Sequence, residues 1–432
     1  MIPIQNTGIL LTEADCFMHT LEKRHISQTG MSTNICHYLL ELKGKFNADE
    51  FRKDINTNSD ILWLAGLMPY KKFPLALPKW IKKKILKEIP VYTHTSDRLL
   101  PEAILNRGMH SDEAYICIDI VYRSTGDTAF IFSWHHLLMD GYGVVLLLKQ
   151  LAGKANMPLH HVSNMHSKEK LSLRQLINAT HAKFFVDRSS KKPLTTIDPP
   201  EKISNRHQKV RVIRFTAQES EQIDANGPKL GARFGRSPMY LASAARGVKK
   251  LLVDKGVALH DFWIPVPKDQ RLKGSDGPLL GNHLSFLFYR LKASELNSLK
   301  NTVTSINDQM VDQIKSGTSR NYDILMKFLR RTPTPLYYFW IKGPQGGSLA
   351  SFLFTVAADH PEDFKVFGGH PIIDAWSFPS GIYPPGLSFA FMRFKSNLHI
   401  MINYFEEVIT EKEIDLLEKQ LKEDLLMNAN HA

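Results

Sequence analysis

Residues 133–143 read SWHHLLMDGYG: two adjacent histidines, three apolar residues, an aspartate and a glycine at the end of a long apolar run. The stretch TAFIFSWHH (128–136) predicts a strand, and VVLLLKQLAG (144–153) predicts a buried helix. The alternating stretch YICIDIVYR (115–123) and the turn residues after it predict an antiparallel hairpin with 128–136. The histidines are therefore expected at a strand end, on the loop that enters a helix.

This loop brings together two imidazoles and a carboxylate. Successive strand residues point to opposite faces, so His135 and His136 cannot both face one cleft. A metal site on His136 and Asp140 has no third ligand nearby in the sequence, and no metal is expected. The remaining interpretation is a base on a rigid loop, because an imidazole has a pKa near neutrality and can accept a proton at working pH.

The length and composition predict a globular protein of two domains. The chain has 432 residues, of which 43% are hydrophobic and 23% are charged. Residues 186–208 (VDRSSKKPLTTIDPPEKISNRHQ) are rich in Ser, Pro and charge, and predict a linker. We therefore expect one domain over 1–185 and another over 209–432. Because both halves mix helical and strand patterns, the expected class is mixed α/β.

The second half carries its own strands and helices. SPMYLASAARGVKKLLVDKG (237–256) predicts a helix with Ser and Pro at its start. FWIPVPKDQR (262–271) and NHLSFLFYRL (282–291) predict strands on either side of a Gly-rich loop. Residues 387–405, LSFAFMRF and NLHIMINYF with two residues between them, predict a hairpin.

The cysteines and the N-terminus bear on the compartment. Cys16, Cys36 and Cys117 are odd in number and form no C-x-x-C pair, which argues against disulfides and structural zinc and suits a reducing cytoplasm. The first residues lack a basic region followed by an apolar one, so no secretory signal is expected. No apolar run approaches the roughly 20 residues that a membrane span needs. We expect a cytoplasmic protein.

The formal net charge of +12 calls for an acidic partner or a solvated surface. The basic residues do not alternate with aromatic ones in a nucleic-acid-reading pattern, so nucleic acid is not expected. They cluster instead in KWIKKKILK (79–87) and KFLRR (327–331), where apolar residues lie among the charges. Such clusters fit solvated helix faces with buried apolar sides, peripheral contact with an anionic membrane surface, or binding of an acyl donor's phosphates.

The pattern H-H-x-x-x-D-G resembles the signature of the superfamily of CoA-dependent acyltransferases and nonribosomal peptide condensation domains. LLTEADCFMHTLEKRH (10–25) looks like the opening of its wax ester synthase and diacylglycerol acyltransferase branch. Residues 262–271, followed ten residues later by Gly-Asn, and the C-terminal hairpin are also similar to that branch. FTVAADHP (354–361) departs from it, because the Asn and Pro-Gly-Pro of an S-N-V-P-G-P-like segment are missing.

The resemblance implies two chloramphenicol-acetyltransferase-like domains in a V-shaped pseudo-dimer with a central tunnel. It implies that His136 is the catalytic base and that Asp140 is a structural anchor, paired across the domain junction with Arg271. Gly141 would allow the tight exit from the loop, and His135 is expected to be structural.

Three further residues are candidates for the oxyanion position or the cleft wall. Thr355 stands where the related branch has its Asn, and its hydroxyl is a hydrogen-bond donor. Asn282 belongs to the matched Gly-Asn pair, and His283 follows it directly. A donor aimed at the developing oxyanion would stabilise the transition state of acyl transfer.

The function implied is transfer of an acyl group from a thioester, on CoA or an acyl carrier protein, to the hydroxyl of a small-molecule acceptor. The transfer is expected to be direct, because the sequence has no G-x-S-x-G elbow. Apolar segments around the expected cleft suggest a lipid-like substrate. No permanently bound cofactor is expected; the CoA or phosphopantetheine group arrives with the donor. Two alternatives stay open: a free-standing condensation enzyme that forms an amide, and a catalytically idle binding homologue.

Overall fold

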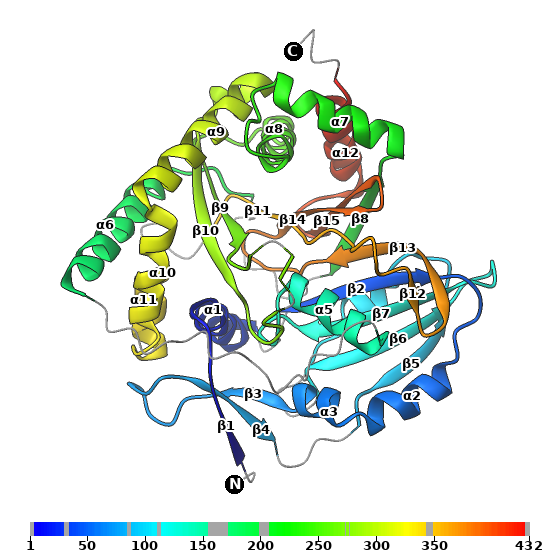
Figure 1. Ribbon diagram of the computed structural model, residues 1–432. Coiled ribbons are helices and arrows are strands. Elements are labelled where there is room, and N and C mark those ends of the chain that lie inside the picture. The colour runs from blue at the N-terminus through cyan, green and yellow to red at the C-terminus, as the bar shows by residue number, and fades with distance from the viewer. Residues whose placement is uncertain are drawn as a thin grey trace.

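The computed structural model describes residues 4–29, 34–83, 88–109, 114–153, 172–197, 207–272, 274–275, 277–342 and 349–427. Its helices and strands form the mixed α/β architecture expected from the sequence (Figure 1). A six-stranded sheet and a four-stranded sheet form its two largest layers, and a two-stranded ribbon and a three-stranded sheet accompany them.

The six-stranded sheet carries the histidine loop at the end of one of its central strands. Its strand pairs are antiparallel except for β5 and β6, which are parallel. The predicted hairpin of β6 and β7 is confirmed, with Ile116 opposite Trp134. In order across the sheet the strands are β12 (Val366–Phe367), β13 (His370–Phe378), β2 (Ile35–Leu42), β7 (Thr128–His135), β6 (Ile116–Tyr122) and β5 (Val91–Thr95).

Strand β7 is buried along its whole length, which explains its nearly continuous apolar sequence. Its neighbour β13 comes from the second half of the chain, so residues within 209–432 complete a sheet otherwise built from residues 35–135. The predicted linker, 186–208, begins inside α6 (Leu173–Ser189), and residues 198–206 of it lie outside the described residues.

The other elements of the first half flank this sheet. Helix α1 begins directly after a cap, since the main-chain N–H of Asp15 donates to the Thr12 hydroxyl at 3.0 Å. The helices are α1 (Glu13–Thr29), α2 (Ala48–Thr57), α3 (Ser59–Ala65), α4 (Glu102–Leu105) and α5 (Gly141–Leu151). A three-stranded sheet has the order β1 (Ile4–Leu10), β4 (Lys79–Lys83), β3 (Leu67–Tyr70).

The basic cluster at 79–87 is not the helix face that one interpretation of the sequence predicted. Residues Lys79–Lys83 form the central strand β4, with Trp80 and Ile81 buried. Pairing on both edges outweighs the helix preference of lysine at these positions. Residues 84–87 lie outside the described residues.

The second half builds the four-stranded sheet and the ribbon. The predicted hairpin of β14 and β15 is confirmed, with Leu387 opposite Tyr404, and β11 joins β14 in parallel. The four-stranded sheet has the order β11 (Leu353–Val356), β14 (Leu387–Phe394), β15 (Asn397–Phe405), β8 (Gln208–Arg214). The ribbon consists of β9 (Phe262–Asp269) and β10 (Leu284–Leu291).

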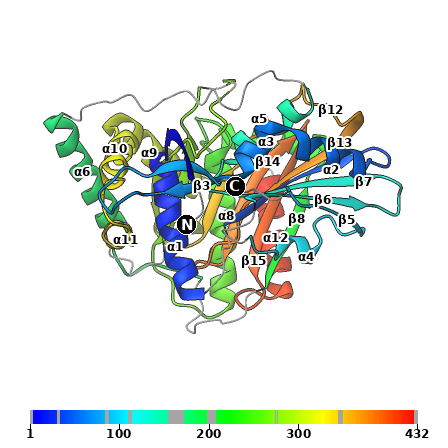
Figure 2. The same cartoon turned by 90° about the horizontal axis from the view of Figure 1, so that it is seen from below.

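The helices of the second half lie in two groups, one over the four-stranded sheet (Figure 1) and one gathered at the side of the molecule that lies on the left of Figure 2. A capping box of Thr410 and Glu413 starts the last helix, because each side chain bonds the other's main-chain N–H. The helices are α6, α7 (Ala217–Lys229), α8 (Ser237–Asp254), α9 (Leu299–Ser316), α10 (Thr318–Leu329), α11 (Thr334–Lys342) and α12 (Glu411–Leu426), with a short 3₁₀ turn, η1 (Glu295–Asn297).

The β9–β10 ribbon contributes to two hydrophobic cores. Trp263 and Phe288 belong to the core beneath the six-stranded sheet and α5, and their rings stack 5.6 Å apart. Ile264 and Leu287 belong to the core between the four-stranded sheet and the helices α8, α9 and α12. The ribbon thereby fixes one half of the molecule against the other. None of the helices in the described part of the chain is both long and apolar enough to cross a bilayer.

Candidate active site

The histidine loop is short and closed by its own hydrogen bonds. His135 is the last residue of β7, and Asp140 caps α5 by accepting from the Gly143 N–H at 2.9 Å. The Trp134 indole donates to the Met139 carbonyl at 2.8 Å. Residues 136–140 therefore form a tight connection between a buried strand and a helix, as the sequence predicted.

Asp140 joins this loop to the second half of the chain. Its Oδ2 accepts from Nη1 of Arg271 at 2.9 Å and from the His283 main-chain N–H at 2.9 Å. Arg271 also donates from Nε and Nη2 to the Pro278 carbonyl, at 3.1 and 3.0 Å. The two side chains are only 2% and 12% exposed, for Arg271 and Asp140. The carboxylate is thus fully engaged and is placed to hold the loop rather than to transfer protons.

Asn282 makes a second attachment between the halves. Its Nδ2 donates to the His136 carbonyl at 2.9 Å and to Oδ1 of Asp15 at 2.9 Å. One residue earlier, the Gly281 N–H donates to the Leu138 carbonyl at 2.8 Å. The main chain of the histidine loop is therefore hydrogen-bonded to residues 281–282 on the loop between β9 and β10.

Asp15 connects the start of α1 to the same point. Its carboxylate accepts from the main-chain N–H groups of Thr12 and Asn282, each at 2.8 Å. The side chain is fully buried; burial raises its pKa above the usual value, against the lowering effect of these hydrogen bonds. The start of α1, the β9–β10 loop and the histidine loop, far apart in the sequence, therefore meet at one point.

His136 itself is half-buried. Its main-chain N–H donates to the Asn34 carbonyl at 2.8 Å, while Nδ1 is buried and, within the described part of the chain, has no hydrogen-bond partner of normal geometry. Burial lowers the pKa of the ring, but the nearby Cys36, the residue's own carbonyl and Asp140 outweigh it and raise the pKa to about 9. Cys36 and that carbonyl are close polar neighbours of the ring and not hydrogen-bond partners of normal geometry.

His135 points into the protein instead. Its Nε2 lies 2.6 Å from Oε1 of Glu22, and its ring stacks on Tyr115 with centroids 4.6 Å apart. The Leu137 N–H donates to its Nδ1 at 3.2 Å. The two adjacent imidazoles thus have different surroundings, and the structural role expected for His135 fits its contacts.

The other candidate residues fall in different places. The side-chain amide of Asn282 donates its hydrogen bonds to Asp15 and to the histidine loop, which favours an anchoring role over an oxyanion role. His283 is half-buried and donates from Nε2 to the Leu280 carbonyl at 2.9 Å. Thr355 is half-buried on β11, and the hydrogen bonds described above for the histidine loop do not include it.

The sequence singled out Gly141, but the glycine that close packing requires is Gly143. A Cβ added to Gly141 would meet no atom within 4 Å, so the loop exit does not need a glycine there for space. A Cβ on Gly143 would lie 2.6 Å from the Leu279 carbonyl. The close approach of the β9–β10 loop to α5 is therefore what requires a glycine, at position 143.

Sequence reasoning missed the partners that this geometry adds. In the sequence Asp15 stood only within the 10–25 stretch that resembles the related branch, and Cys36 only as a reduced thiol. Nothing local marks their proximity to the loop: Asp15 lies 267 positions from Asn282, and Cys36 comes near through the pairing of β2 with β7. For the contact between Asp15 and Asn282, the only signal in the sequence was the Gly-Asn pair that contains Asn282.

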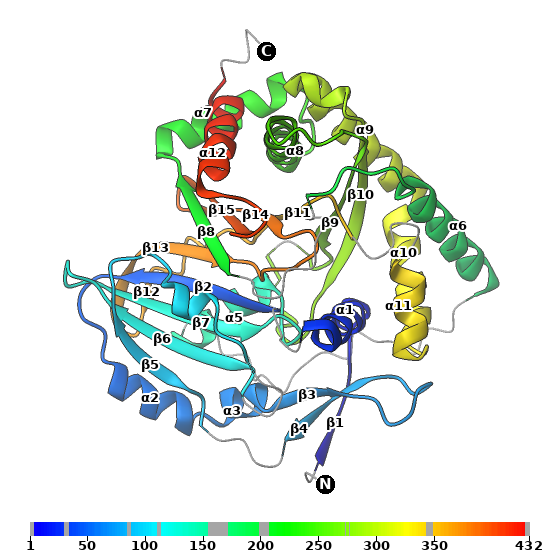
Figure 3. The ribbon, with the colours of Figure 1, turned by 180° about the vertical axis from the view of Figure 1, so that it is seen from behind.

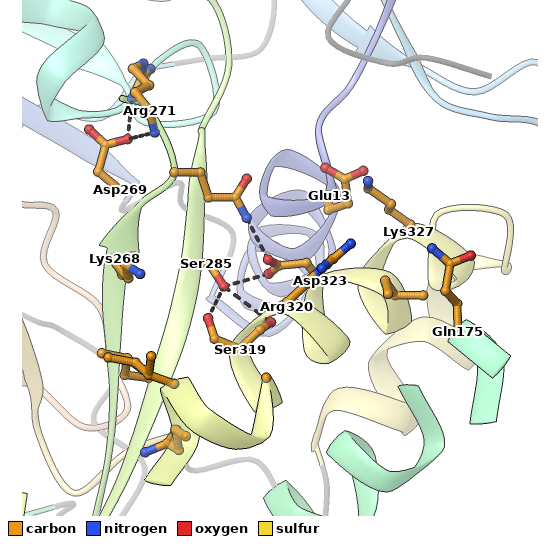
Figure 4. Close-up of a pocket in the computed structure, with 16 residues that line it drawn as sticks. Glu13, Gln175, Lys268, Asp269, Arg271, Ser285, Ser319, Arg320, Asp323 and Lys327 are labelled. Atoms are coloured by element: carbon orange, nitrogen blue, oxygen red, sulfur yellow. Dashed lines mark hydrogen bonds and ion pairs between the residues drawn. The ribbon is translucent and has the colours of Figure 1, made fainter. Parts of the chain in front are cut away.

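A cavity of about 600 Å³ borders the Arg271 anchor. Figure 4 shows its polar lining, with Ser285, Ser319 and Asp323 turned toward one another. The Ser285 hydroxyl donates to Asp323 at 2.7 Å and lies 2.6 Å from the Ser319 hydroxyl. Burial raises the pKa of Asp323 to about 6. Basic side chains also line the cavity, namely Lys268, Arg320 and Lys327.

Comparison with known proteins gives matches at the level of structure. Neither a protein-family model nor a curated protein sequence matches the chain. The first condensation domain of the calcium-dependent antibiotic synthetase, in complex with a substrate analogue, has a TM-score of 0.65 at 12% identity, with 98% of this chain and 96% of that chain covered. The wax ester synthase/diacylglycerol acyltransferase from Marinobacter aquaeolei VT8 has a TM-score of 0.62 at 12% identity, with 98% and 100% covered.

A trichothecene 15-O-acetyltransferase from Fusarium sporotrichioides is similar to the same degree, with a TM-score of 0.66 at 13% identity and 96% and 94% of the two chains covered. At such identities the likeness establishes the fold and not the activity. That fold extends over nearly the whole chain in all three comparisons. The chain therefore has the fold of the superfamily of CoA-dependent acyltransferases and condensation domains, the one that its H-H-x-x-x-D-G pattern resembles.

Proposed function

We propose that the protein transfers an acyl group from a thioester to a hydroxyl, with His136 as the general base. The observation that carries this proposal is the fixation of the loop that presents the half-buried His136, by anchors from two distant segments: through Asp140 to Arg271 and through Asn282 to Asp15. A base held in this way is pre-oriented toward its substrate, which is what proton abstraction during acyl transfer needs.

The proposed proton path follows from the two ring nitrogens. Because Nδ1 of His136 is buried, Nε2 is the nitrogen that would accept the proton of the attacking hydroxyl. The alkoxide oxygen forms the new ester bond as the carbon–sulfur bond breaks, and the proton passes from the imidazolium to the leaving thiolate. The products are an ester and a free thiol, and the imidazole returns to its neutral form.

The cavity beside Arg271 is the proposed site for the polar part of a substrate. Lys268, Arg320 and Lys327 on its wall suit the phosphates of CoA or of a phosphopantetheine arm. Asp269 and Asp323 on the same wall limit the positive charge, so shape and hydrogen bonding share in the selection. A lipid-like acceptor remains part of the proposal, by analogy with the wax ester synthase fold alone.

The decisive experiment measures thiol release. Purified protein is incubated with acyl-CoA donors of several chain lengths and a panel of alcohols, and free CoA is detected with a thiol reagent. His136→Ala should remove release that depends on the acceptor, whereas His207→Ala, which removes a 70%-exposed imidazole elsewhere, should not. Equal release by the wild type and His136→Ala would overturn the role of His136.

The same assay separates the amide-forming alternative, which the condensation-domain fold supports equally. Release with amines and not with alcohols would favour amide formation. Donor binding measured by calorimetry, without release on any acceptor, would favour an idle binding homologue.

A further inference from the structure

Two helices of this molecule present apolar stripes to solvent. On α6, Leu173, Ile177 and Phe184 are 75%, 47% and 73% exposed. On α11, Leu336, Phe339 and Trp340 are 45%, 66% and 43% exposed. The spacings of four and seven residues on α6, and of three and one on α11, place each trio on one side of its helix. We call these six residues the α6–α11 surface.

The two stripes belong to one side of the molecule. Figures 1 and 3 show α6, α10 and α11 together, on the opposite side from α2 and α12. The Lys183 ammonium of α6 lies 5.9 Å from the ring centre of Trp340 on α11. Lys71, which begins the loop between β3 and β4, donates to the Thr332 carbonyl at 2.7 Å, just before α11.

More exposed apolar side chains lie beside the α6–α11 surface. Phe73 and Leu75, on the loop that Lys71 attaches, are 55% and 62% exposed, and Phe328 at the end of α10 is 54% exposed. With these and Phe185, half of the large exposed apolar side chains in the described part of the chain belong to this side. Solvent-facing apolar residues gathered in this way mark an interaction surface.

The charge around this surface is mainly positive. The stretches 71–79, 173–189 and 327–342 together contain ten lysines and arginines and a single acidic residue, Asp187. That acidic residue is already paired with Lys183 on the same helix. The surface is therefore apolar at its centre and positive around it.

We propose that the α6–α11 surface binds an anionic lipid membrane. Leu, Phe and Trp side chains can enter the boundary between head groups and acyl chains, while the surrounding lysines and arginines contact lipid phosphates. A symmetric pairing of two copies would oppose two positive surfaces, and is disfavoured for that reason. An acidic protein would complement the positive charge. It would, however, also have to cover apolar side chains on two separate helices and a loop, which a membrane surface does without a matching shape.

Membrane binding at this place has a consequence for the cavity beside Arg271. Gln175 of α6 and Lys327 of α10 line that cavity, so it lies next to the proposed membrane-binding side. A lipid-soluble acceptor would then reach the protein from the bilayer rather than from water. The binding itself does not require acyl transfer, so the two proposals can fail separately.

The test is co-sedimentation of the full chain with vesicles of phosphatidylcholine alone, or mixed with phosphatidylglycerol. The wild type should bind the mixed vesicles and bind less at high salt. Phe339→Ser/Trp340→Ser should weaken the partition about tenfold or more, because two large apolar side chains no longer insert. Lys72→Glu/Arg331→Glu should weaken it through charge alone.

The matched control is Phe234→Ser/Leu416→Ser, which removes side chains of comparable exposure, 59% and 43%, from other parts of the molecule. It should bind like the wild type. Equal losses in the control and the α6–α11 variant, or no binding of the wild type to anionic vesicles, would overturn the proposal. A dimer in lipid-free solution that Phe339→Ser/Trp340→Ser dissociates, without vesicle binding, would identify the surface as a contact between copies instead.

Fluorescence gives an independent readout of where the lipid contacts the protein. Of the six tryptophans, Trp340 is exposed, Trp63 is half-buried, and Trp80, Trp134, Trp263 and Trp376 are buried. Lipids brominated on their acyl chains should quench the emission of Trp340 on binding. Trp340→Phe should remove this quenching and keep most of the binding; quenching that persists in Trp340→Phe would place the contact elsewhere.

Discussion

His136 illustrates how neighbouring groups set the protonation state of a single residue. Burial alone would lower the pKa of this imidazole, and Cys36, the residue's own carbonyl and Asp140 act in the opposite direction. The net pKa of about 9 lies above the usual value of 6.5. Since a general base acts only in its neutral form, this residue would be mostly protonated at neutral pH and become active as the pH rises.

The pH profile of kcat/KM tests this balance. We expect its rising limb near pH 9, because His136 must lose a proton before it can accept one from the acceptor. Cys36→Ala should move the limb to lower pH, because it removes a neighbour that raises the pKa and leaves the effect of burial. A limb that stays in place in Cys36→Ala would show that the thiol does not influence His136.

The proposed role of Asp140 is to hold the histidine loop in place through its hydrogen bonds, without transferring protons. Asp140→Ala would leave the guanidinium of Arg271 buried and without its carboxylate partner at position 140. Arg271 keeps a second carboxylate partner, Asp269, which accepts from Nη1 at 3.2 Å, so the expected loss is about 1–3 kcal/mol, the cost of buried hydrogen-bonding groups left unsatisfied. We expect a lower midpoint of urea unfolding together with lost activity. Lost activity with an unchanged midpoint would argue against the anchor and for a chemical role of the carboxylate.

At the scale of elements, the β9–β10 loop and the start of α5 are packed against each other without spare room. Gly143 has the Leu279 carbonyl where a Cβ would stand, whereas Gly141, two residues earlier, has open space. Substituting each of these two glycines in turn therefore distinguishes the steric effect of the close contact at Gly143 from the general effect of replacing a glycine.

Gly143→Ala should lower the free energy of unfolding by about 1–3 kcal/mol, because the loop at Leu279 must move away from α5. Gly141→Ala should change it by less than about 1 kcal/mol. Chemical denaturation of both variants provides the comparison. Equal effects would mean that helix propensity, and not the close contact, determines the outcome.

At the scale of the whole molecule, Asn282 is where α1, the histidine loop and the β9–β10 loop meet. Asn282→Ala removes the hydrogen bonds of this side chain to Asp15 and to the His136 carbonyl. The histidine loop then loses its side-chain link to the β9–β10 loop and, through that loop, to α1. We expect kcat to fall about tenfold to a hundredfold through misplacement of His136. Stability should fall by about 1–3 kcal/mol.

Asn106→Ala is the matched control for this prediction. Asn106 also bridges distant segments, since it donates to the Gln208 carbonyl at 3.0 Å and accepts from its N–H at 2.8 Å. This variant should lose stability and keep kcat per folded molecule. A similar loss of kcat in both variants would show that the effect of Asn282 is general destabilisation.

Much of this architecture could be predicted from local patterns. The continuous apolar run before the histidines gave β7, which is buried on both faces, and the alternation before it gave β6, because successive side chains of a strand point to opposite faces. The expected pairing of Asp140 with Arg271 came from the family pattern. The helix-face interpretation of the basic stretch at 79–83 was wrong, because the strand state of these residues depends on β1 and β3, which pair with them on both edges.

The sequence by itself determined the strand–loop–helix that presents His136, since apolar periodicity and the N-cap at Asp140 act over a few neighbouring residues. Only the tertiary structure decided what surrounds that imidazole. Cys36 comes near it through strand pairing, and Asp15 and Asn282 meet across 267 positions. The pKa of the ring and the rigidity of its loop depend on distances in space, and no local pattern of residues encodes these.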